Sequence, residues 1–301
     1  MTEITLSDVS SEQLLQLGDA ALTTGDARLA FKLYAAALPK TKGFLWLRLR
    51  LRVGIARNAN NRTLTSLAVL RAIDDTGFIF VGEGLATWNK TLPFMEDKRF
   101  LDLVEKHADL APLPNWHWNL HTVLWAINQA RTIPGDFVEL GVFKGHTTSF
   151  LADYVDFAQW KQRWYLYDTF EGIPDDQLDE GWAEINQSTY KDTFSFDAVR
   201  DLFGQYDNID VIKGRVPEIL QQKCPDKISF IHLDLNNTAA EIGALNYLYD
   251  RISPGGVIVL DDYGWAASRQ QHLAENAWFA ERGLQILALP TGQGLFVKPG
   301  V

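Results

Sequence analysis

From Gly135 onward the chain alternates short apolar runs with stretches of helical spacing, and this pattern constrains the fold more than any other feature. Helical stretches separate the first five runs, which predicts a parallel sheet with helices on both faces. Only PTGQG joins the last two runs, which is too short for a crossover helix, so we expect an antiparallel hairpin at the sheet edge. The seven predicted strands are Phe137–Leu140, Trp164–Asp168, Ile209–Lys213, Ile228–Asp234, Val257–Asp261, Leu284–Leu289 and Leu295–Lys298.

The first part of the chain is predicted to be helical. Ser10 to Gln13 has the pattern of a capping box, and apolar residues follow at helical spacing with a break at Gly25. We therefore divide the chain into a helical N-terminal region, residues 1–112, and a sheet-bearing domain, residues 113–301.

The order of small and large residues in the N-terminal region resembles a tetratricopeptide repeat hairpin. Gly18 and Ala30 would let two antiparallel helices approach closely, while Tyr34 fills the space between them. A plain helical hairpin is an equal alternative, because a second repeat fits poorly at most of its positions. That second repeat would carry Gly54, Ser66 and Leu70.

Composition narrows the location and the partners of the protein. Cys224 is the only cysteine, so no internal disulfide is possible, and this fits a reducing cytoplasm. No apolar run is long enough to span a membrane, and the first residues lack the pattern of a secretion signal. With a net charge of −10, the chain is not expected to bind nucleic acid. We expect a cytoplasmic protein that needs neither membrane nor nucleic acid, and we leave self-association open.

The stretch GDFVELGVFKGHTT places an acid and two glycines around the end of the first strand. Gly141 lets the chain turn tightly, and Gly145 lets a helix or a ligand come close. The spacing differs from the Gly-x-Gly-x-x-Gly of dinucleotide enzymes, and Glu139 would repel a pyrophosphate but suit a cation such as S-adenosylmethionine. Asp168, at the end of the second strand, is placed to hold the ribose hydroxyls; alternatively, it caps the next turn.

Four motifs resemble the macrocin O-methyltransferase (TylF-like) family in its bacterial branch, over roughly residues 116–299: GDFVELGVFKGHTT, YDTFEGIP, ISPGGVIVLDDYGW and LPTGQGLFVK. The resemblance implies a class I methyltransferase (Rossmann-like) fold, which five parallel strands ending in a hairpin also favour. It implies magnesium-dependent methyl transfer from S-adenosylmethionine to a sugar hydroxyl, with deoxysugars on macrolides and aminocoumarins as the best-known substrates. The predicted donor-binding residues are Glu139, Gly141, Val142, Gly145, Thr147, Thr148, Asp168, Thr169, Phe170, Gly214 and Asp234.

Three acids follow the fourth and fifth strands: Asp234, Asp261 and Asp262. Neighbouring strand ends lie about 5 Å apart, so these carboxylates would repel one another unless a cation sits among them or one takes a proton. The resemblance maps the metal ligands of the family, Mg²⁺ being the expected ion, onto these three acids and makes Asp234 the candidate general base. Many relatives carry an aspartate where this chain has Asn236, and their usual tyrosine is absent near Thr238, which puts substrate contacts and, less so, metal dependence in question. In the alternative reading, Asp261 caps a turn, Asp262 faces solvent and Asp234 holds the cofactor.

Further candidates surround these acids. His232 shares a strand face with Asp234 and is either a second base or a packed histidine. His117 and His121 are four residues apart, and packing is favoured over metal binding. The polar segment of residues 175–194 is expected to form a lid or a substrate wall. Further pocket candidates are Trp265, His272 and Gln293.

The leading hypothesis is an S-adenosylmethionine-dependent, magnesium-dependent O-methyltransferase that acts on a hydroxyl of a sugar or another small-molecule glycoside. The alternative is a non-catalytic scaffold that combines helical hairpins with a degenerate methyltransferase domain. A nicotinamide oxidoreductase is disfavoured by the glycine spacing. The sequence names neither the acceptor nor the hydroxyl that is methylated.

Overall fold

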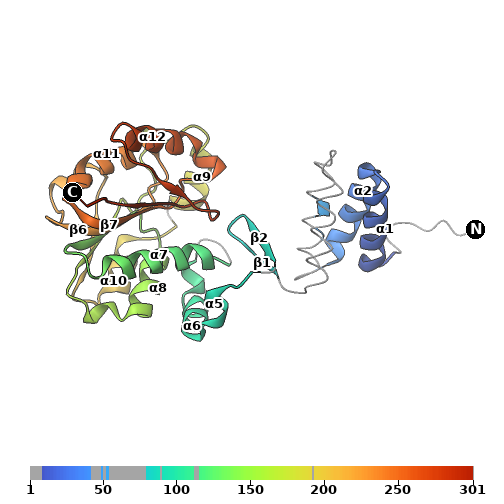
Figure 1. Cartoon of the computed structure of the whole chain (residues 1–301), viewed down its shortest axis with the longest axis horizontal. Helices are drawn as coiled ribbons and strands as arrows, with labels where there is room; N and C mark the ends of the chain where they lie inside the picture. The colour runs from blue at the N-terminus through green and yellow to red at the C-terminus, as the bar shows by residue number, and fades with distance from the viewer. Residues whose placement is uncertain are drawn as a thin grey trace, which may run out of the picture. The chain divides into compact units, whose positions relative to one another are not determined.

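The computed structural model describes residues 9–41, 49, 52–53, 79–88, 90–111, 115–191 and 193–300. The chain forms two compact units, one of residues 1–80 and 87–90 and one of residues 81–86 and 91–301 (Figure 1). Residues 91–111, which we placed in the N-terminal region, group with the sheet-bearing unit. Within the described ranges, no helix combines the length and apolarity needed to cross a bilayer.

The first unit contains an antiparallel pair of helices, α1 (Ser11–Thr23) and α2 (Ala27–Ala37). The predicted capping box is confirmed, because Ser10 and Gln13 each accept the backbone N–H of the other. Gly18 lies so close to the ring of Tyr34 that a Cβ would overlap it, which is the close approach that the sequence predicted. The repeat assignment stays a prediction, since its second unit (Gly54, Ser66, Leu70) lies outside the described residues.

The second unit is built on a seven-stranded sheet with the order β5-β4-β3-β6-β7-β9-β8. The first five strands along the chain pair in parallel, and β9 is antiparallel to both β7 and β8, so the predicted sheet and its edge hairpin are confirmed. The strands are β3 (Asp136–Leu140), β4 (Trp164–Asp168), β5 (Ile209–Lys213), β6 (Ile228–Leu233), β7 (Ile252–Leu260), β8 (Leu287–Ala288) and β9 (Gly294–Val297).

Several strand boundaries differ from the prediction, and β8 is shorter than the predicted run Leu284–Leu289. β7 begins at Ile252, which pairs with Ile228 across a register shift, so the residues SPGG continue the strand instead of preceding it. β6 and β7 end one residue early, which leaves Asp234 and Asp261 just beyond the hydrogen-bonded ladder. The strand order reverses at β3, whose neighbours β4 and β6 continue in opposite directions, and ligands of open α/β sheets bind at such a position.

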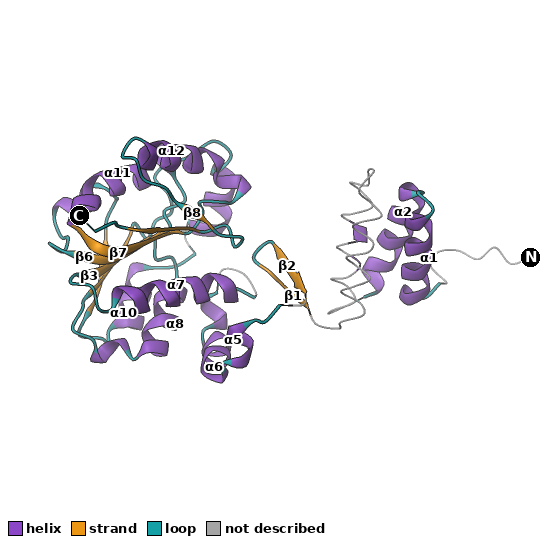
Figure 2. Cartoon of the chain, in the orientation of Figure 1, coloured by secondary structure: helices purple, strands orange, loops and turns teal. Residues whose placement is uncertain are grey.

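Helices cover both faces of the sheet (Figure 2). One face carries α7 (His117–Ala130), α8 (His146–Val155) and α10 (Phe196–Phe203), and the other carries α11 (Thr238–Leu248) and α12 (Arg269–Ala280). Buried apolar residues of β3, β6 and β7 form a core with residues of α11 and α12, such as Leu245 and Phe279. The remaining short helices are α5 (Pro93–Glu96), α6 (Lys98–Lys106) and α9 (Ala183–Ile185).

A two-stranded hairpin, β1 (Ile79–Gly82) and β2 (Leu85–Trp88), was not predicted. Its two turn residues, Glu83 and Gly84, have φ of 52° and 69°. Positive φ at both positions is typical of the type I′ turn that closes tight hairpins, where asparagine or aspartate usually precedes glycine. The glutamate at the first position is the reason why the turn signal was missed.

Candidate active site

A cavity of about 340 Å³ opens at the carboxyl ends of the parallel strands. The residues that line it include most of the predicted donor-binding set: Glu139, Gly141, Val142, Thr147, Asp168, Thr169, Gly214 and Asp234. The other three predicted residues, Gly145, Thr148 and Phe170, do not line the cavity and contact residues beside it.

Gly141 brings the ends of β3 and β6 together. Its φ is 89°, and a Cβ at this position would overlap the backbone carbonyl of Asp234. On either side of this contact the ladder continues, because Gly141 N–H donates to Tyr167 O and Asp234 N–H donates to Leu140 O, both at 2.8 Å. Only glycine therefore fits between the first strand and the candidate base.

Gly145 immediately precedes α8 and has a φ of 80°, and a Cβ there would press against the ring of Phe203 on α10. The glycine thus serves helix packing. One turn later, the Thr148 hydroxyl donates a hydrogen bond to Oε2 of Glu139. Thr148 therefore supports a cavity residue instead of facing the cavity itself.

Asp168 fixes the loop after β3. Its Oδ2 accepts the N–H groups of Val142 at 2.8 Å and Phe143 at 2.9 Å, and its Oδ1 accepts that of Phe170 at 2.7 Å. Burial raises the pKa of Asp168, and these backbone donors oppose the rise. The hydrogen bond from Phe170 caps the turn after β4, as in the alternative interpretation, and the ribose contact stays a prediction.

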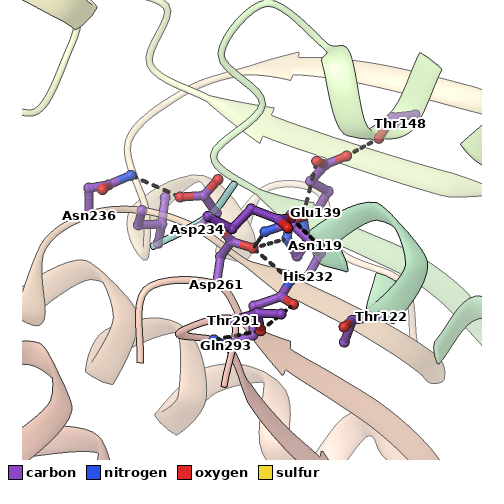
Figure 3. A network of polar contacts seen from close by, with 12 residues as sticks. Asn119, Thr122, Glu139, Thr148, His232, Asp234, Asn236, Asp261, Thr291 and Gln293 are labelled. Carbon is purple, nitrogen blue, oxygen red and sulfur yellow. Dashed lines mark hydrogen bonds and ion pairs between the residues drawn. The ribbon is translucent and has the colours of Figure 1, made fainter. Parts of the chain in front are cut away.

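A row of polar side chains crosses the sheet beside the cavity (Figure 3). Nδ1 of His232 lies 3.2 Å from Oε1 of Glu139, and its Nε2 lies 3.3 Å from Oδ1 of Asp261. The same Oδ1 accepts the side-chain amides of Asn119 at 2.7 Å and Gln293 at 3.0 Å. All five residues are at most 5% exposed. Elements far apart in the sequence thus converge on one carboxylate oxygen.

The row is electrostatically balanced around His232. Burial alone would lower its pKa, but hydrogen bonds to Asp261 and Glu139 outweigh burial and raise the pKa well above the usual value. Burial would raise the pKa of Asp261, yet the hydrogen bonds from His232, Asn119 and Gln293 hold it below its usual value. Glu139 has a raised pKa because its burial outweighs the contact with His232. Both ring nitrogens of His232 are thus engaged by buried carboxyl groups, which fits the packed interpretation, and its role as a second base stays a prediction.

Asp234, like Asp168, is a partly accessible acid that lines the cavity. Oδ1 of Asp234 accepts the amide of Asn236 at 2.8 Å. Burial, followed by the charges of Asp261 and Asp262, raises the pKa of Asp234 well above its usual value. Asn236, the position at which the sequence departs from many relatives, thus donates to the candidate base.

The donor set suits a magnesium ion at two of the three predicted ligands. Ligand atoms of His232, Asp234 and Asp261 lie within 4.8 Å of one another. The ring nitrogens of His232 are engaged, but Oδ2 of Asp261 receives no hydrogen bond from the described residues, and carboxylate oxygens are the ligands that magnesium prefers. Asp262 does not join this group or line the cavity, and burial together with Asp261 and Glu275 raises its pKa to about 8.

A pair of buried glutamates, which was not predicted, lies between α11 and α12. Glu241 and Glu275 are both fully buried, and Glu241 Oε1 accepts the backbone N–H of Leu235 at 3.0 Å. Burial, then Glu275, raises the pKa of Glu241 well above its usual value, and burial raises that of Glu275 to about 7. Burial of two carboxyl groups close together disfavours ionisation of both, which is the direction of the two pKa shifts.

The segment of residues 175–194 forms one wall of the cavity, as expected. Tyr190 and Phe194 line it and pack edge-on against Phe143, with ring centroids 5.5 and 4.7 Å away. Asp179 ties the segment to the start of α11, because its Oδ2 accepts both the N–H of Thr238 at 3.0 Å and its hydroxyl at 2.6 Å. The opening of this wall as a lid stays a prediction.

The remaining candidates divide between support and packing. Gln293 joins the polar row, whereas Trp265 and His272 are not among the lining residues. His117 and His121 pack against Phe94, and burial lowers the pKa of both, which agrees with the packing interpretation.

The site residues that were not anticipated include Asn119, Lys144 and His146. Lys144 and His146 line the cavity, and burial lowers the pKa of His146 to about 4, so its ring is neutral. Asn119 occupies the buried face of α7 together with Val123 and Ala126. A polar residue on an apolar helical face is a sequence signal that could have identified it.

The chain is similar to the 8-demethyl-8-(2,3-dimethoxy-alpha-L-rhamnosyl)-tetracenomycin-C 4'-O-methyltransferase of Streptomyces olivaceus, with 27% identity over 169 residues, which are 53% of this chain and 63% of the relative. It is also similar to the mycinamicin III 3''-O-methyltransferase of Micromonospora griseorubida, with 26% identity over 152 residues, 46% of this chain and 59% of the relative. The chain spans less than two thirds of the length of these curated relatives.

Among solved structures, the O-methyltransferase NovP superposes with a TM-score of 0.51 and 20% identity, over 60% of this chain and 80% of NovP. This similarity confirms the class I methyltransferase fold. The sequence profile of the macrocin O-methyltransferase (TylF) family matches residues 118–285, more than half of the chain. The chain therefore belongs to the macrocin O-methyltransferase (TylF) family.

Proposed function

We propose that this protein transfers a methyl group from S-adenosylmethionine to a hydroxyl of a sugar or another small-molecule glycoside, with the help of a magnesium ion. Membership of an O-methyltransferase family supports the reaction class. The sugar acceptor is supported by two relatives whose names describe methylation of a glycoside, a rhamnosyl tetracenomycin and a mycinamicin.

The charge of the cavity carries this proposal. Among the residues that the structure describes, four carboxyl residues line it, Glu139, Asp168, Asp234 and Asp261, against one lysine, Lys144. Such a surface repels the phosphates of a dinucleotide and attracts a sulfonium or a divalent cation. The same argument disfavours a nicotinamide cofactor, in agreement with the glycine spacing.

Asp234 is the group best placed to receive the proton of the acceptor. In the proposed step, the acceptor oxygen forms a bond to the methyl carbon while the bond between that carbon and the sulfonium sulfur breaks. The hydroxyl proton passes to Asp234, whose raised pKa makes it a stronger base than an exposed aspartate, and S-adenosylhomocysteine leaves with a neutral sulfur.

The other residues orient and balance the site. Asp168 holds the loop of Val142 and Phe143 against the donor position. We assign to His232 the role of a buried counter-charge between Glu139 and Asp261 in place of a second base. A magnesium ion at Asp234 and Asp261 would supply positive charge that stabilises the developing negative charge of the acceptor.

Calorimetry with S-adenosylhomocysteine and a methyl-transfer assay on a panel of sugars and glycosides test this proposal. We expect donor binding, transfer to at least one hydroxylated acceptor, and loss of transfer in EDTA that magnesium restores. Asp234→Asn should abolish transfer, whereas Asp250→Asn, an exposed acid on the surface, should not. Donor binding without transfer to any acceptor would favour the scaffold alternative, and binding of reduced nicotinamide in place of the donor would refute the proposal.

A further inference from the structure

We propose that Glu83, in the turn of the β1–β2 hairpin, is a positioning residue for methyl transfer: it fixes the first turn of α7 and so holds Asn119 against Asp261. This inference rests on the proposed function for its catalytic consequence. Its structural part, a distant carboxylate that orders the start of α7, is independent of that function.

Glu83 provides the cap that α7 lacks locally. The residue before the helix, Trp116, makes no capping hydrogen bond through its side chain. Glu83, 35 residues earlier than Trp118, accepts the N–H of Trp118 through Oε2 at 3.0 Å and that of Asn119 through Oε1 at 2.5 Å. These are two of the four N–H groups that a helix leaves unpaired at its start, and a carboxylate also interacts favourably with the helix dipole there.

Asn119 transmits this restraint to the site. The residue whose backbone N–H is held by Glu83 also donates from its side chain to Oδ1 of Asp261 at 2.7 Å, the shortest of the three contacts to that oxygen. Asn119 is 3% exposed, so its amide has little freedom to move independently of its backbone. A shift of the first turn of α7 would therefore move the donor that orients Asp261.

The hairpin turn is itself held in place at the edge of the site. Glu83 is 7% exposed, although it lies at the tip of a hairpin. A Cβ on the neighbouring Gly84 would lie 3.5 Å from the ring of Trp265. The ring of Trp265 stacks on Trp116, with centroids 6.4 Å apart and planes 11° apart, and Trp116 lines the cavity. The turn thus contacts the residues after β7 as well as the start of α7.

A pure stabilising role is the competing explanation, because removal of any helix cap costs roughly 1 kcal/mol. Two features distinguish the explanations. A positioning role acts through Asn119, so its effect should disappear once the Asn119 amide has been removed. If Glu83 only stabilises the fold, loss of another helix cap in the same unit should lower activity to the same extent. Asp97 is such a cap, because its side chain accepts the N–H of Phe100 at the start of α6.

The experiment compares Glu83→Ala, Glu83→Gln, Asn119→Ala and the Glu83→Ala/Asn119→Ala double variant in the full chain, with Asp97→Ala as the matched cap control. For Glu83→Ala we expect kcat to fall about tenfold or more, with the donor Kd and acceptor KM within about threefold. Glu83→Gln keeps one acceptor oxygen and should lie between the parent and Glu83→Ala. The double variant should be no slower than Asn119→Ala by more than about twofold, because coupled residues are not additive.

Hydrogen exchange supplies a readout without substrate. The backbone amides of Trp118 and Asn119 should exchange faster in Glu83→Ala than in the parent, and their exchange rates should be unchanged in Asp97→Ala. An unchanged kcat in Glu83→Ala, or fully additive losses in the double variant, would overturn the inference. Should Glu83→Ala fail to fold, Glu83→Gln carries the same comparison. A parent protein that transfers no methyl group would refute the proposed function, and unaltered amide exchange would then separately refute the cap.

Discussion

Gly141 packs against the backbone carbonyl of Asp234 with no room for a side chain, so that the turn after the first parallel strand and the candidate base share one contact. We expect Gly141→Ala to lower the free energy of unfolding by about 3 kcal/mol or more, because it combines an overlap with an unfavourable φ. Urea denaturation of the purified variant measures this change.

Gly283→Ala is the matched control for that measurement. Gly283 also has a positive φ, of 68°, but a Cβ there would meet nothing within 4 Å. Its substitution should cost only the conformational part, roughly 1 kcal/mol. Equal losses in the two variants would mean that the contact with Asp234 is not restrictive.

Asp261→Asn is expected to reduce methyl transfer by at least about a hundredfold, since it removes a charge that faces the cavity and balances His232. Donor affinity, measured by calorimetry, should stay within a few fold. A comparable loss of donor binding and turnover would instead indicate a structural residue.

Asp262→Asn separates the two-carboxylate from the three-carboxylate arrangement of the predicted metal site. The pKa of Asp262 is raised to about 8, so its carboxyl is largely protonated at pH 7, and it does not line the cavity. We expect Asp262→Asn to weaken Mn²⁺ binding less than Asp261→Asn does. Electron paramagnetic resonance of bound Mn²⁺ measures this difference. The reverse order would restore Asp262 as a ligand.

Glu275→Gln should stabilise the protein in a pH-dependent way. Burial raises the pKa of Glu275 from 4.5 to about 7 in the folded state, so the folded protein holds this proton more tightly than the unfolded chain. Stability is therefore lost as pH rises from about 4.5 to about 7, and an amide that mimics the protonated form escapes this loss. Urea titrations should show the variant to be more stable than the parent at pH 8, with a smaller difference at pH 4.5.

Glu105→Gln, which replaces an exposed acid on α6, is the matched surface control for that titration. A difference between Glu275→Gln and the parent that is the same at both pH values would mean that the folded protein and the unfolded chain bind the Glu275 proton equally tightly.

Asp179→Ala should loosen the cavity wall. It removes the acceptor for both the N–H and the hydroxyl of Thr238, so residues 175–194 lose their tie to α11. We expect faster limited proteolysis within this segment and a higher acceptor KM. Thr238→Val, which removes only the hydroxyl donor, should have a smaller effect, and cleavage rates that match those of the parent would contradict a role as a latch.

The sheet was predictable because its signal is local. Each strand is a compact apolar run, and a five-residue connection such as PTGQG leaves only one geometry for the last two strands. The β1–β2 hairpin was missed since glutamate is unusual in its turn, and its conformation depends on the contacts of Glu83 with α7.

The acids of the site were also predictable, because parallel strands end at one edge. Their partners were not. Asn119 reaches Asp261 from 142 residues away, and a helix carries no local sign of which carboxylate its amide will meet. The burial of His232 between two acids likewise depends on strand register, which places Glu139 opposite His232 across β3 and β6.

Gln293 contacts Asp261 directly, and Glu83 acts on it through Asn119. Both Gln293 and Glu83 lie outside the stretch of residues 118–285 that identifies the family. A fragment trimmed to that stretch would keep the candidate acids Asp234 and Asp261 and still lack two of the side chains that hold Asp261 in place. Boundaries for expression, grafting or domain exchange should therefore follow the hydrogen bonds of Asp261, and begin no later than the hairpin.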